Sequence, residues 1–129
     1  MEENISKNLS ALICEDEFDV CSFLVEILEE SGHFNVIDTA LDGKQAVELL
    51  KTKKYDFFLL DLNMPKIKGD DVAEILKESG FIMGEKIIVI SGFLDEVAMS
   101  HMDSLGITNT LEKPFTKEEL LKKLKSLLQ

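Results

Sequence analysis

Several polar and charged residues of this chain directly follow short apolar segments. They are Glu15, Asp16, Asp61, Asn63, Ser91 and Lys113. Three carboxylates in one place repel one another unless a cation compensates their charge, and Lys113 offsets only part of that charge. Mg²⁺ suits a site made of a few carboxylates and water molecules. The residue types therefore predict a magnesium site, provided that the fold brings them together.

Asp61 is the candidate for the reacting group of such a site. Carboxylates can act as nucleophiles toward phosphorus and form acyl phosphates. The ammonium group of Lys113 and the hydroxyl group of Ser91 would stabilise charge on the phosphoryl oxygens. The predicted chemistry is the transfer of a phosphoryl group to Asp61, with Ser91 and Lys113 as the assisting residues.

Five short apolar segments predict the strands that position these residues. An uninterrupted apolar run such as residues 57–60 is typical of a strand buried on both faces of a parallel sheet. The segments are Leu9–Cys14, Phe34–Asp38, Phe57–Leu60, Lys86–Ile90 and Ile107–Leu111. Each is followed by helical spacing, and strands that alternate with helices favour a parallel sheet covered on both faces. The predicted fold class is a doubly wound α/β domain, at whose switch point the carboxyl ends of the strands converge.

The helices are predicted from apolar residues that recur every three or four positions. The predicted helices run from about Val20 to Gly32, from Gly43 to residues 51–54, from Val72 to Gly80, from Asp95 to Ser104, and through Leu120–Leu128. The last of these follows Thr116 and Glu119, whose spacing is that of a capping box.

Length and charge restrict the class of protein further. The 129 residues are expected to form one domain, with residues 1–8 as an N-terminal extension and 9–129 as the folded unit. The net charge of −11 argues against direct binding to nucleic acid or an anionic membrane, because both require Lys and Arg to neutralise phosphates. Neither a secretory signal nor an apolar run approaching the ~20 residues of a membrane span is present. We therefore expect a cytoplasmic protein without membrane insertion.

Four motifs give the chain its resemblance to a known family. They are ICEDE at 13–17, LLDLNMPKIKG at 59–69, IIVISG at 87–92 and LEKPF at 111–115. With these motifs, residues 9–128 resemble the receiver domain of two-component response regulators, in particular the single-domain regulators of chemotaxis. The resemblance implies a flavodoxin-like sheet of five parallel strands in the order 2-1-3-4-5, with five helices, and a function in phosphorelay signalling.

The resemblance also implies roles for individual residues. Asp61 would be the phosphoacceptor, and Asp16 and Asp61 would ligate Mg²⁺ directly. Glu15 would assist the metal through water, and Asn63 would contribute its backbone carbonyl.

A second group of residues would contact the phosphoryl group or relay the switch. Ser91 and Lys113 would touch the phosphoryl oxygens, while Ser91, Thr110 and Pro114 would form the switch. Pro114 would follow a cis peptide bond, which suits an X-Pro bond in a tight turn.

The sequence departs from the family pattern at three positions. Glu15 stands where Asp is more common, and Gly92 stands where Ala is usual. Thr110 occupies the position where the family usually has Tyr or Phe, a ring that is commonly part of the switch. A Thr cannot make the same movement, so the output mechanism is expected to differ.

The expected partners are a histidine kinase or His-phosphotransfer protein as the donor and a downstream protein target. The target would bind the face formed by the fourth helix, the fifth strand and the fifth helix. The chain would not be an enzyme beyond catalysing its own phosphorylation and dephosphorylation. One alternative is a pseudo-receiver that binds partners without phosphorylation, which Thr110 favours. Another is a phosphatase of the haloacid-dehalogenase type, which needs a second Asp where this chain has Asn63.

Overall fold

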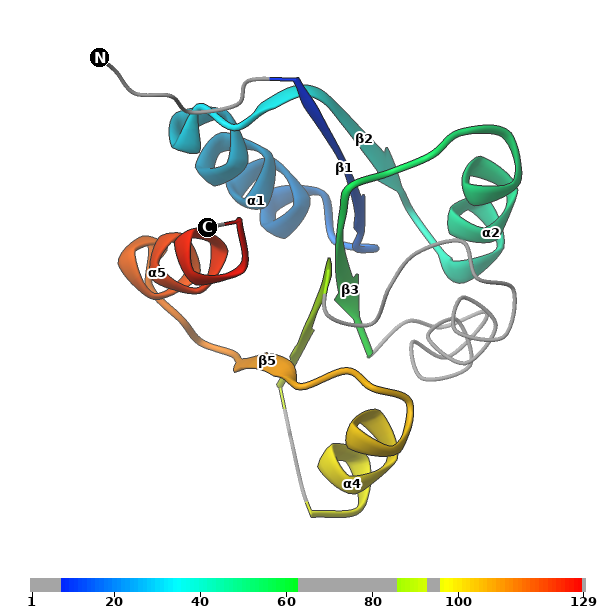
Figure 1. Cartoon of the computed structure of the whole chain (residues 1–129), viewed down its shortest axis with the longest axis vertical. Coiled ribbons are helices and arrows are strands. Elements are labelled where there is room, and N and C mark those ends of the chain that lie inside the picture. The colour runs from blue at the N-terminus through cyan, green and yellow to red at the C-terminus, as the bar shows by residue number, and fades with distance from the viewer. Residues whose placement is uncertain (1–7, 63–85, 93–95, 129) are drawn as a thin grey trace.

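The computed structural model describes residues 8–62, 86–92 and 96–128. They form one five-stranded parallel sheet in the order β2-β1-β3-β4-β5 with helices on both faces (Figure 1). The strands are β1 (Leu9–Cys14), β2 (Phe34–Ala40), β3 (Phe57–Asp61), β4 (Ile87–Ser91) and β5 (Asn109–Glu112). The helices are α1 (Phe18–Ser31), α2 (Gly43–Thr52), α4 (Glu96–Ser104) and α5 (Lys117–Leu128). The predicted flavodoxin-like fold and its strand order are confirmed, and the predicted third helix lies outside the described residues.

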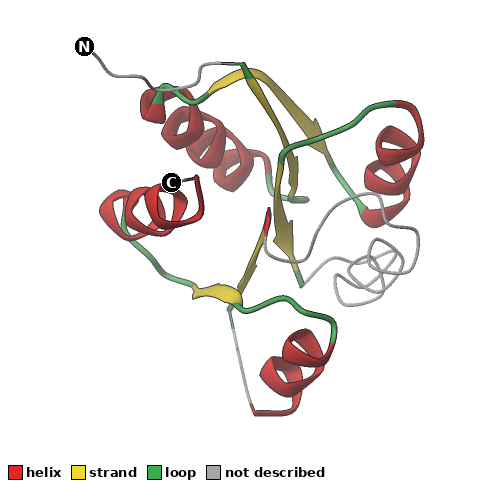
Figure 2. Ribbon diagram, in the orientation of Figure 1, coloured by secondary structure: helices red, strands yellow, loops and turns green. Residues whose placement is uncertain are grey.

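The sheet separates two apolar cores, and Figure 2 shows the helices that cover its two faces. On β1, Ala11 and Ile13 pack toward α1 and α5, whereas Leu12 and Cys14 pack toward α2 and α4. All residues of β3 and β4 are buried. Both faces of these central strands carry apolar side chains because both are covered by helices, which is why they appear in the sequence as uninterrupted apolar runs.

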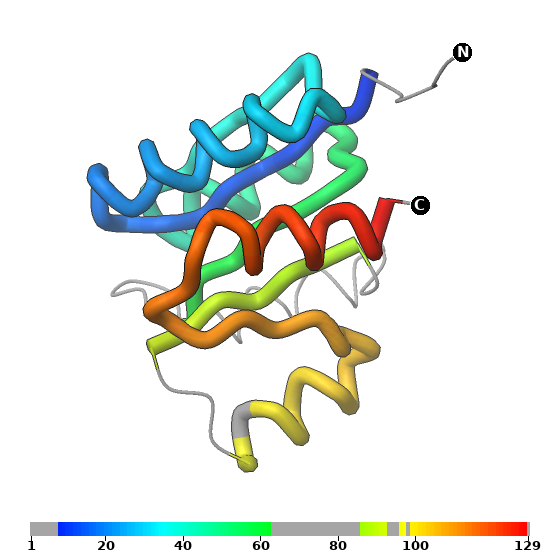
Figure 3. Tube along the Cα trace, turned by 90° about the vertical axis from the view of Figure 1, so that its left-hand side faces the viewer, coloured from blue at the N-terminus to red at the C-terminus, as the bar shows by residue number. Residues whose placement is uncertain are grey.

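The face covered by α1 and α5 is turned toward the viewer in Figure 3. The two helices lie side by side there, and Lys117 of α5 forms an ion pair with Glu30 of α1, with 3.0 Å between Nζ and Oε2. Among the described residues, no helix has the length and apolar character needed to cross a bilayer.

Two predicted helix ends, the start of α5 and the end of α1, are present in detail. The hydroxyl oxygen of Thr116 accepts the backbone N–H of Glu119 at 3.1 Å, and the carboxylate of Glu119 accepts the N–H of Thr116 at 2.8 Å. This reciprocal pair is the capping box that the sequence predicts. At the other end of the chain, α1 stops at Gly32, whose φ of 79° lies in the left-handed region that glycine tolerates.

Four strands begin or end one or two residues away from the predicted positions. The third ends at Asp61 instead of Leu60, and the fourth is Ile87–Ser91 instead of Lys86–Ile90. The second strand continues beyond Asp38 to Ala40, which pairs with Cys14. The fifth strand begins at Asn109 instead of Ile107. The reason is that the N–H of Ile107 donates to the carbonyl of Met102, which ties the buried Ile107 to the end of α4 and leaves it in the connection before β5.

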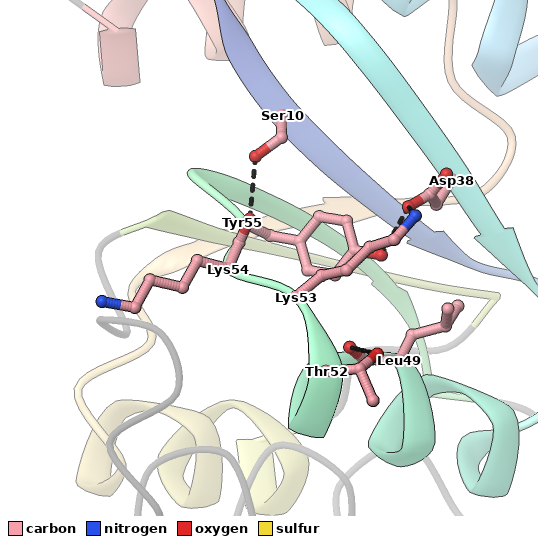
Figure 4. Close-up of polar contacts among 7 residues, drawn as sticks. All are labelled: Ser10, Asp38, Leu49, Thr52, Lys53, Lys54 and Tyr55. Atoms are coloured by element: carbon pink, nitrogen blue, oxygen red, sulfur yellow. Dashed lines mark hydrogen bonds and ion pairs between the residues drawn. The ribbon is translucent and has the colours of Figure 1, made fainter.

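The connection from α2 to β3 is fixed by polar contacts to the two preceding strands (Figure 4). Tyr55 donates from its hydroxyl group to Asp38 at 2.6 Å, and Lys53 donates to the same carboxylate at 2.9 Å. Ser10 donates to the carbonyl of Lys54 at 3.0 Å. Burial raises the pKa of Asp38, but the hydrogen bonds from Tyr55 and Lys53 outweigh it and leave the pKa below its ordinary value. These contacts set the position at which β3 enters the sheet.

Candidate functional site

The carboxyl ends of β1, β3, β4 and β5 bring four chemically capable residues to one edge of the sheet. Asp61 and Ser91 are the last residues of β3 and β4, while Glu15 and Lys113 directly follow β1 and β5. The N–H of Lys113 donates to the carbonyl of Ser91 at 2.7 Å, which continues the pairing of β4 with β5 beyond their last residues. Parallel strands in this order therefore gather residues that are far apart in the chain.

Three carboxylates form a cluster at this edge. Glu15, Asp16 and Asp61 each offer one oxygen atom, and these oxygens all lie within 4.8 Å of one another. Glu15 and Asp61 are buried, with exposed fractions of 0% and 1%, whereas Asp16 is exposed. The cluster is thus open to solvent on the side of Asp16 and closed on the side of the sheet.

Lys113 supplies the positive charge next to the buried carboxylates. Its Nζ lies 3.4 Å from Oε1 of Glu15 and 3.5 Å from Oδ2 of Asp61. Burial lowers the pKa of Lys113, but the charges of Asp61 and Glu15 outweigh burial and leave the pKa above its ordinary value. One ammonium group therefore bridges two carboxylates, and the three acids of the cluster still carry an excess of negative charge.

Glu15 is held inward by two donors. One carboxylate oxygen accepts the hydrogen bond from Lys113, and the other accepts the backbone N–H of Glu17 at 3.1 Å. Burial raises the pKa of Glu15 to about 7. The charge of Asp61 acts in the same direction, and the two donors oppose it only in part.

The raised pKa of Glu15 predicts that stability depends on pH in the absence of divalent cations. The pKa is 4.5 ordinarily and about 7 in the folded chain, so the folded protein keeps a proton that the unfolded chain has released. The stabilisation is complete below pH 4.5 and is lost as the pH rises through about 7. Urea unfolding of the protein in EDTA should give a lower free energy of unfolding at about pH 8 than at about pH 6, where ordinary carboxyl groups are already ionised.

The matched variant for this measurement is Glu15→Gln, which keeps the shape of the side chain and removes its titration. The wild-type protein should lose more stability than the variant between the two pH values. Equal losses in the two proteins would show that Glu15 does not titrate in this range.

The remaining residues singled out in the sequence lie around this cluster. Ser91 is 1% exposed. Thr110 is partly buried on β5 and pairs in register with Val89 of β4. The peptide bond between Lys113 and Pro114 is cis, as the resemblance implied. Asn63 lies outside the described residues.

The direct pairing of Glu15 with Lys113 was not anticipated from the sequence. The two residues are 98 positions apart, and only the order of the strands makes them neighbours. The sequence did not indicate which of the two adjacent acids turns inward: the structure buries Glu15 and leaves Asp16 exposed, still within the carboxylate cluster.

The residues present fit a Mg²⁺ ion on the chemistry of their donors. Mg²⁺ prefers oxygen ligands, retains several water molecules and commonly binds through one or two carboxylates. The cluster offers three carboxylate oxygens within 4.8 Å of one another, and one of its residues faces solvent, where water molecules can complete the coordination.

Comparison with known proteins agrees with this arrangement. A family model for the response regulator receiver domain matches residues 11–125. Among curated proteins, the transcriptional regulatory protein CpxR of Escherichia coli K12 is 34% identical over 92% of this chain and 48% of its own length. The hybrid signal transduction histidine kinase D of Dictyostelium discoideum is 28% identical over 98% of this chain and 8% of its own length. The chain thus spans about half of one relative and a small part of the other.

Solved structures show the same fold. The receiver domain of the Francisella response regulator 1452 has a TM-score of 0.81 at 26% identity, covering 94% of this chain and 97% of that chain. A CheX–CheY complex with BeF3 and Mg²⁺ from Borrelia burgdorferi contains a chain with a TM-score of 0.81 at 27% identity, covering 94% of this chain and 90% of that chain. The match over residues 11–125, the sheet order and the carboxylate cluster lead to one conclusion: the chain belongs to the receiver domains of two-component response regulators, which act in phosphorelay signalling.

Proposed function

We propose that this receiver domain is a Mg²⁺-dependent switch that accepts a phosphoryl group on Asp61. The observation that carries the proposal is the cluster of Glu15, Asp16 and Asp61 beside the ammonium group of Lys113. Like charges that are buried close together destabilise a fold, and arrangements of this kind cluster at functional sites. We further propose that residues 9–129 form the receiver unit and that residues 1–8 are an extension of it.

The side chains that ligate the ion directly would be those of Asp16 and Asp61. The backbone carbonyl of Asn63 would be a further ligand, and Glu15 would contact the ion through a water molecule. When bound, Mg²⁺ supplies positive charge that lets a phosphoryl donor approach a site which is otherwise strongly negative. The inward position of Glu15, held by the N–H of Glu17, keeps its carboxylate close to Asp61 without exposing it to solvent.

The reaction is a nucleophilic displacement at phosphorus. A carboxylate oxygen of Asp61 forms a bond to the phosphorus atom, and the bond from phosphorus to the donor's leaving group breaks with its electron pair going to the leaving group. The product is an acyl phosphate. Lys113, now 3.5 Å from Asp61, can stabilise the phosphoryl oxygens through its charge, and Ser91 at the end of β4 can donate a hydrogen bond to one of them.

The signal would pass from the site through β4 and β5. Phosphorylation adds ~1.5–2 negative charges at one point, which is enough to bias a two-state element. Lys113 would exchange a carboxylate partner for the phosphoryl group, and the hydroxyl group of Ser91 would move toward the same phosphoryl group. Thr110, on the neighbouring strand β5, fills the position of the usual aromatic switch residue with a smaller side chain. We propose that the rearrangement reaches a protein target through the face built from α4, β5 and α5.

The donor would be a histidine kinase or a phosphotransfer protein. Receiver domains interact with such proteins, and one relative of this chain is itself a hybrid histidine kinase. The CheX–CheY complex of Borrelia burgdorferi contains Mg²⁺ and BeF3, which supports the proposal that a related receiver site takes a metal and a phosphoryl-like group together. Beyond its own phosphorylation and dephosphorylation, the domain would catalyse no reaction.

The experiment that tests the proposal is intact-mass measurement after incubation with acetyl phosphate. The wild-type protein should gain one phosphoryl group in the presence of Mg²⁺ and none in EDTA. Borohydride reduction followed by trypsin should place the modification in the peptide between Lys54 and Lys66, which contains Asp61. If the protein gains no phosphoryl group with Mg²⁺, the pseudo-receiver alternative, in which partners bind without phosphorylation, replaces the proposal.

A further inference from the structure

A groove lies on the side of α1 that faces the end of β2, away from α5. It has a volume of about 690 Å³ and is bordered by α1, the carboxyl end of β2 and the start of α2. The apolar part of its lining consists of Phe18, Cys21, Val25 and Leu41, and polar side chains complete it. Because β2 is an edge strand of the sheet, no further strand covers this side of the described structure.

Two large apolar side chains that line this groove are exposed to solvent. Phe18 is 78% exposed and Leu41 is 52% exposed, while Cys21, which also lines the groove, is buried. Single exposed apolar residues are common on protein surfaces, but several that line one hollow point to an interaction site. The burial of Phe18 and Leu41 by a partner would remove both from water and contribute to its affinity.

The rim of the groove is acidic. Glu26 and Glu29 line it from α1 and are both exposed. Their spacing of three residues places them next to each other along the helix surface. The whole of α1 contains no Lys or Arg, so a ligand with negative charge would be repelled along its length. The groove therefore combines apolar lining residues with charged residues of one sign.

We propose that this groove binds a basic amphipathic helix of a partner protein. An amphipathic helix lays its apolar stripe into a hydrophobic groove and uses anchors spaced by three, four and seven residues. Lys or Arg residues beside that stripe would face Glu26 and Glu29, and such complementarity mainly supplies specificity and fast association. This docking site differs from the proposed output face of α4, β5 and α5, and it does not depend on phosphorylation.

The test uses unphosphorylated protein in EDTA, so that its outcome is independent of Asp61 chemistry. The probe is a synthetic helix of leucine and lysine with an apolar stripe, and its counterpart carries glutamate instead of lysine. Titrations followed by ¹H–¹⁵N NMR should place the shifts caused by the lysine peptide on α1, the end of β2 and the start of α2. The glutamate peptide should not bind.

Matched variants separate the groove from the general attraction of a cation to an acidic protein. Leu41→Ser should weaken binding of the lysine peptide by about tenfold or more, whereas Val97→Ser, at another exposed apolar site, on α4, should not change it. Glu29→Lys should weaken binding and reduce its dependence on salt, whereas Glu118→Lys on α5, with the same change in net charge, should do neither.

Three results would overturn the proposal. The first is an equal effect of Glu29→Lys and Glu118→Lys, which would mean attraction by net charge alone. The second is NMR shifts centred on α4 or α5. The third is self-association of the protein that Leu41→Ser abolishes, which would make a second copy of the chain the occupant of the groove.

Discussion

Asp61→Asn is expected to abolish the gain of a phosphoryl group completely. The amide oxygen and nitrogen of Asn cannot form an acyl phosphate, and no other side chain of the cluster occupies the end of β3. Intact-mass measurement with acetyl phosphate and Mg²⁺ should therefore show the unmodified mass only. The matched control is Asp56→Asn, the same chemical change at the other end of the strand, which should leave phosphorylation intact.

The same substitution is expected to stabilise the protein in EDTA. Removal of the charge of Asp61 relieves its repulsion with Glu15, and Lys113 remains beside Glu15. We expect the free energy of unfolding to rise by about 1–2 kcal/mol, which is a common gain when one destabilising feature of a protein is removed. Asp56→Asn should give no such gain, because Asp56 accepts hydrogen bonds from Ser10. Phosphorylation that persists in Asp61→Asn would place the acceptor elsewhere.

The fold could be predicted because its signals are local. The uninterrupted apolar residues of β3 reflect burial on both faces, and Thr116 with Glu119 marks the start of α5 within four residues of sequence. The end of β2 could not be predicted in this way. A charged residue, Asp38, interrupts its apolar pattern, and the strand tolerates it because Tyr55 and Lys53 donate hydrogen bonds to its carboxylate.

The candidate site could be predicted in its residue types but not in its geometry. Adjacent side chains at the end of a strand point in different directions, so the sequence alone does not say which of Glu15 and Asp16 turns inward. The answer depends on the pairing of β1 with both β2 and β3 and on the arrival of Lys113 from the far end of the chain. Long-range pairs of this kind are a property of the topology and leave no local pattern.

Lys113→Met is expected to destabilise the protein in EDTA, because it leaves the buried carboxylates of Glu15 and Asp61 without their cation. Loss of one partner from a fully buried ion pair costs about 3–5 kcal/mol. Lys113 is 24% exposed, so solvent screens part of the charge and we expect roughly 2–3 kcal/mol. The loss should be larger at about pH 8 than at about pH 6, because a proton on Glu15 removes one of the two uncompensated charges.

Two further variants and the addition of Mg²⁺ test whether uncompensated charge causes the loss of stability in Lys113→Met. Lys117→Met removes an exposed lysine whose partner is Glu30, and it should cost far less stability, because solvent screens surface pairs of this kind. The double variant Glu15→Gln with Lys113→Met should be more stable than Lys113→Met alone, because a neutral amide no longer repels Asp61. If Mg²⁺ binds the folded protein as we propose, it should stabilise Lys113→Met as well, because it supplies the missing positive charge. If neither Mg²⁺ nor Glu15→Gln recovers stability in urea unfolding, Lys113 acts through packing of its aliphatic stem and not through charge.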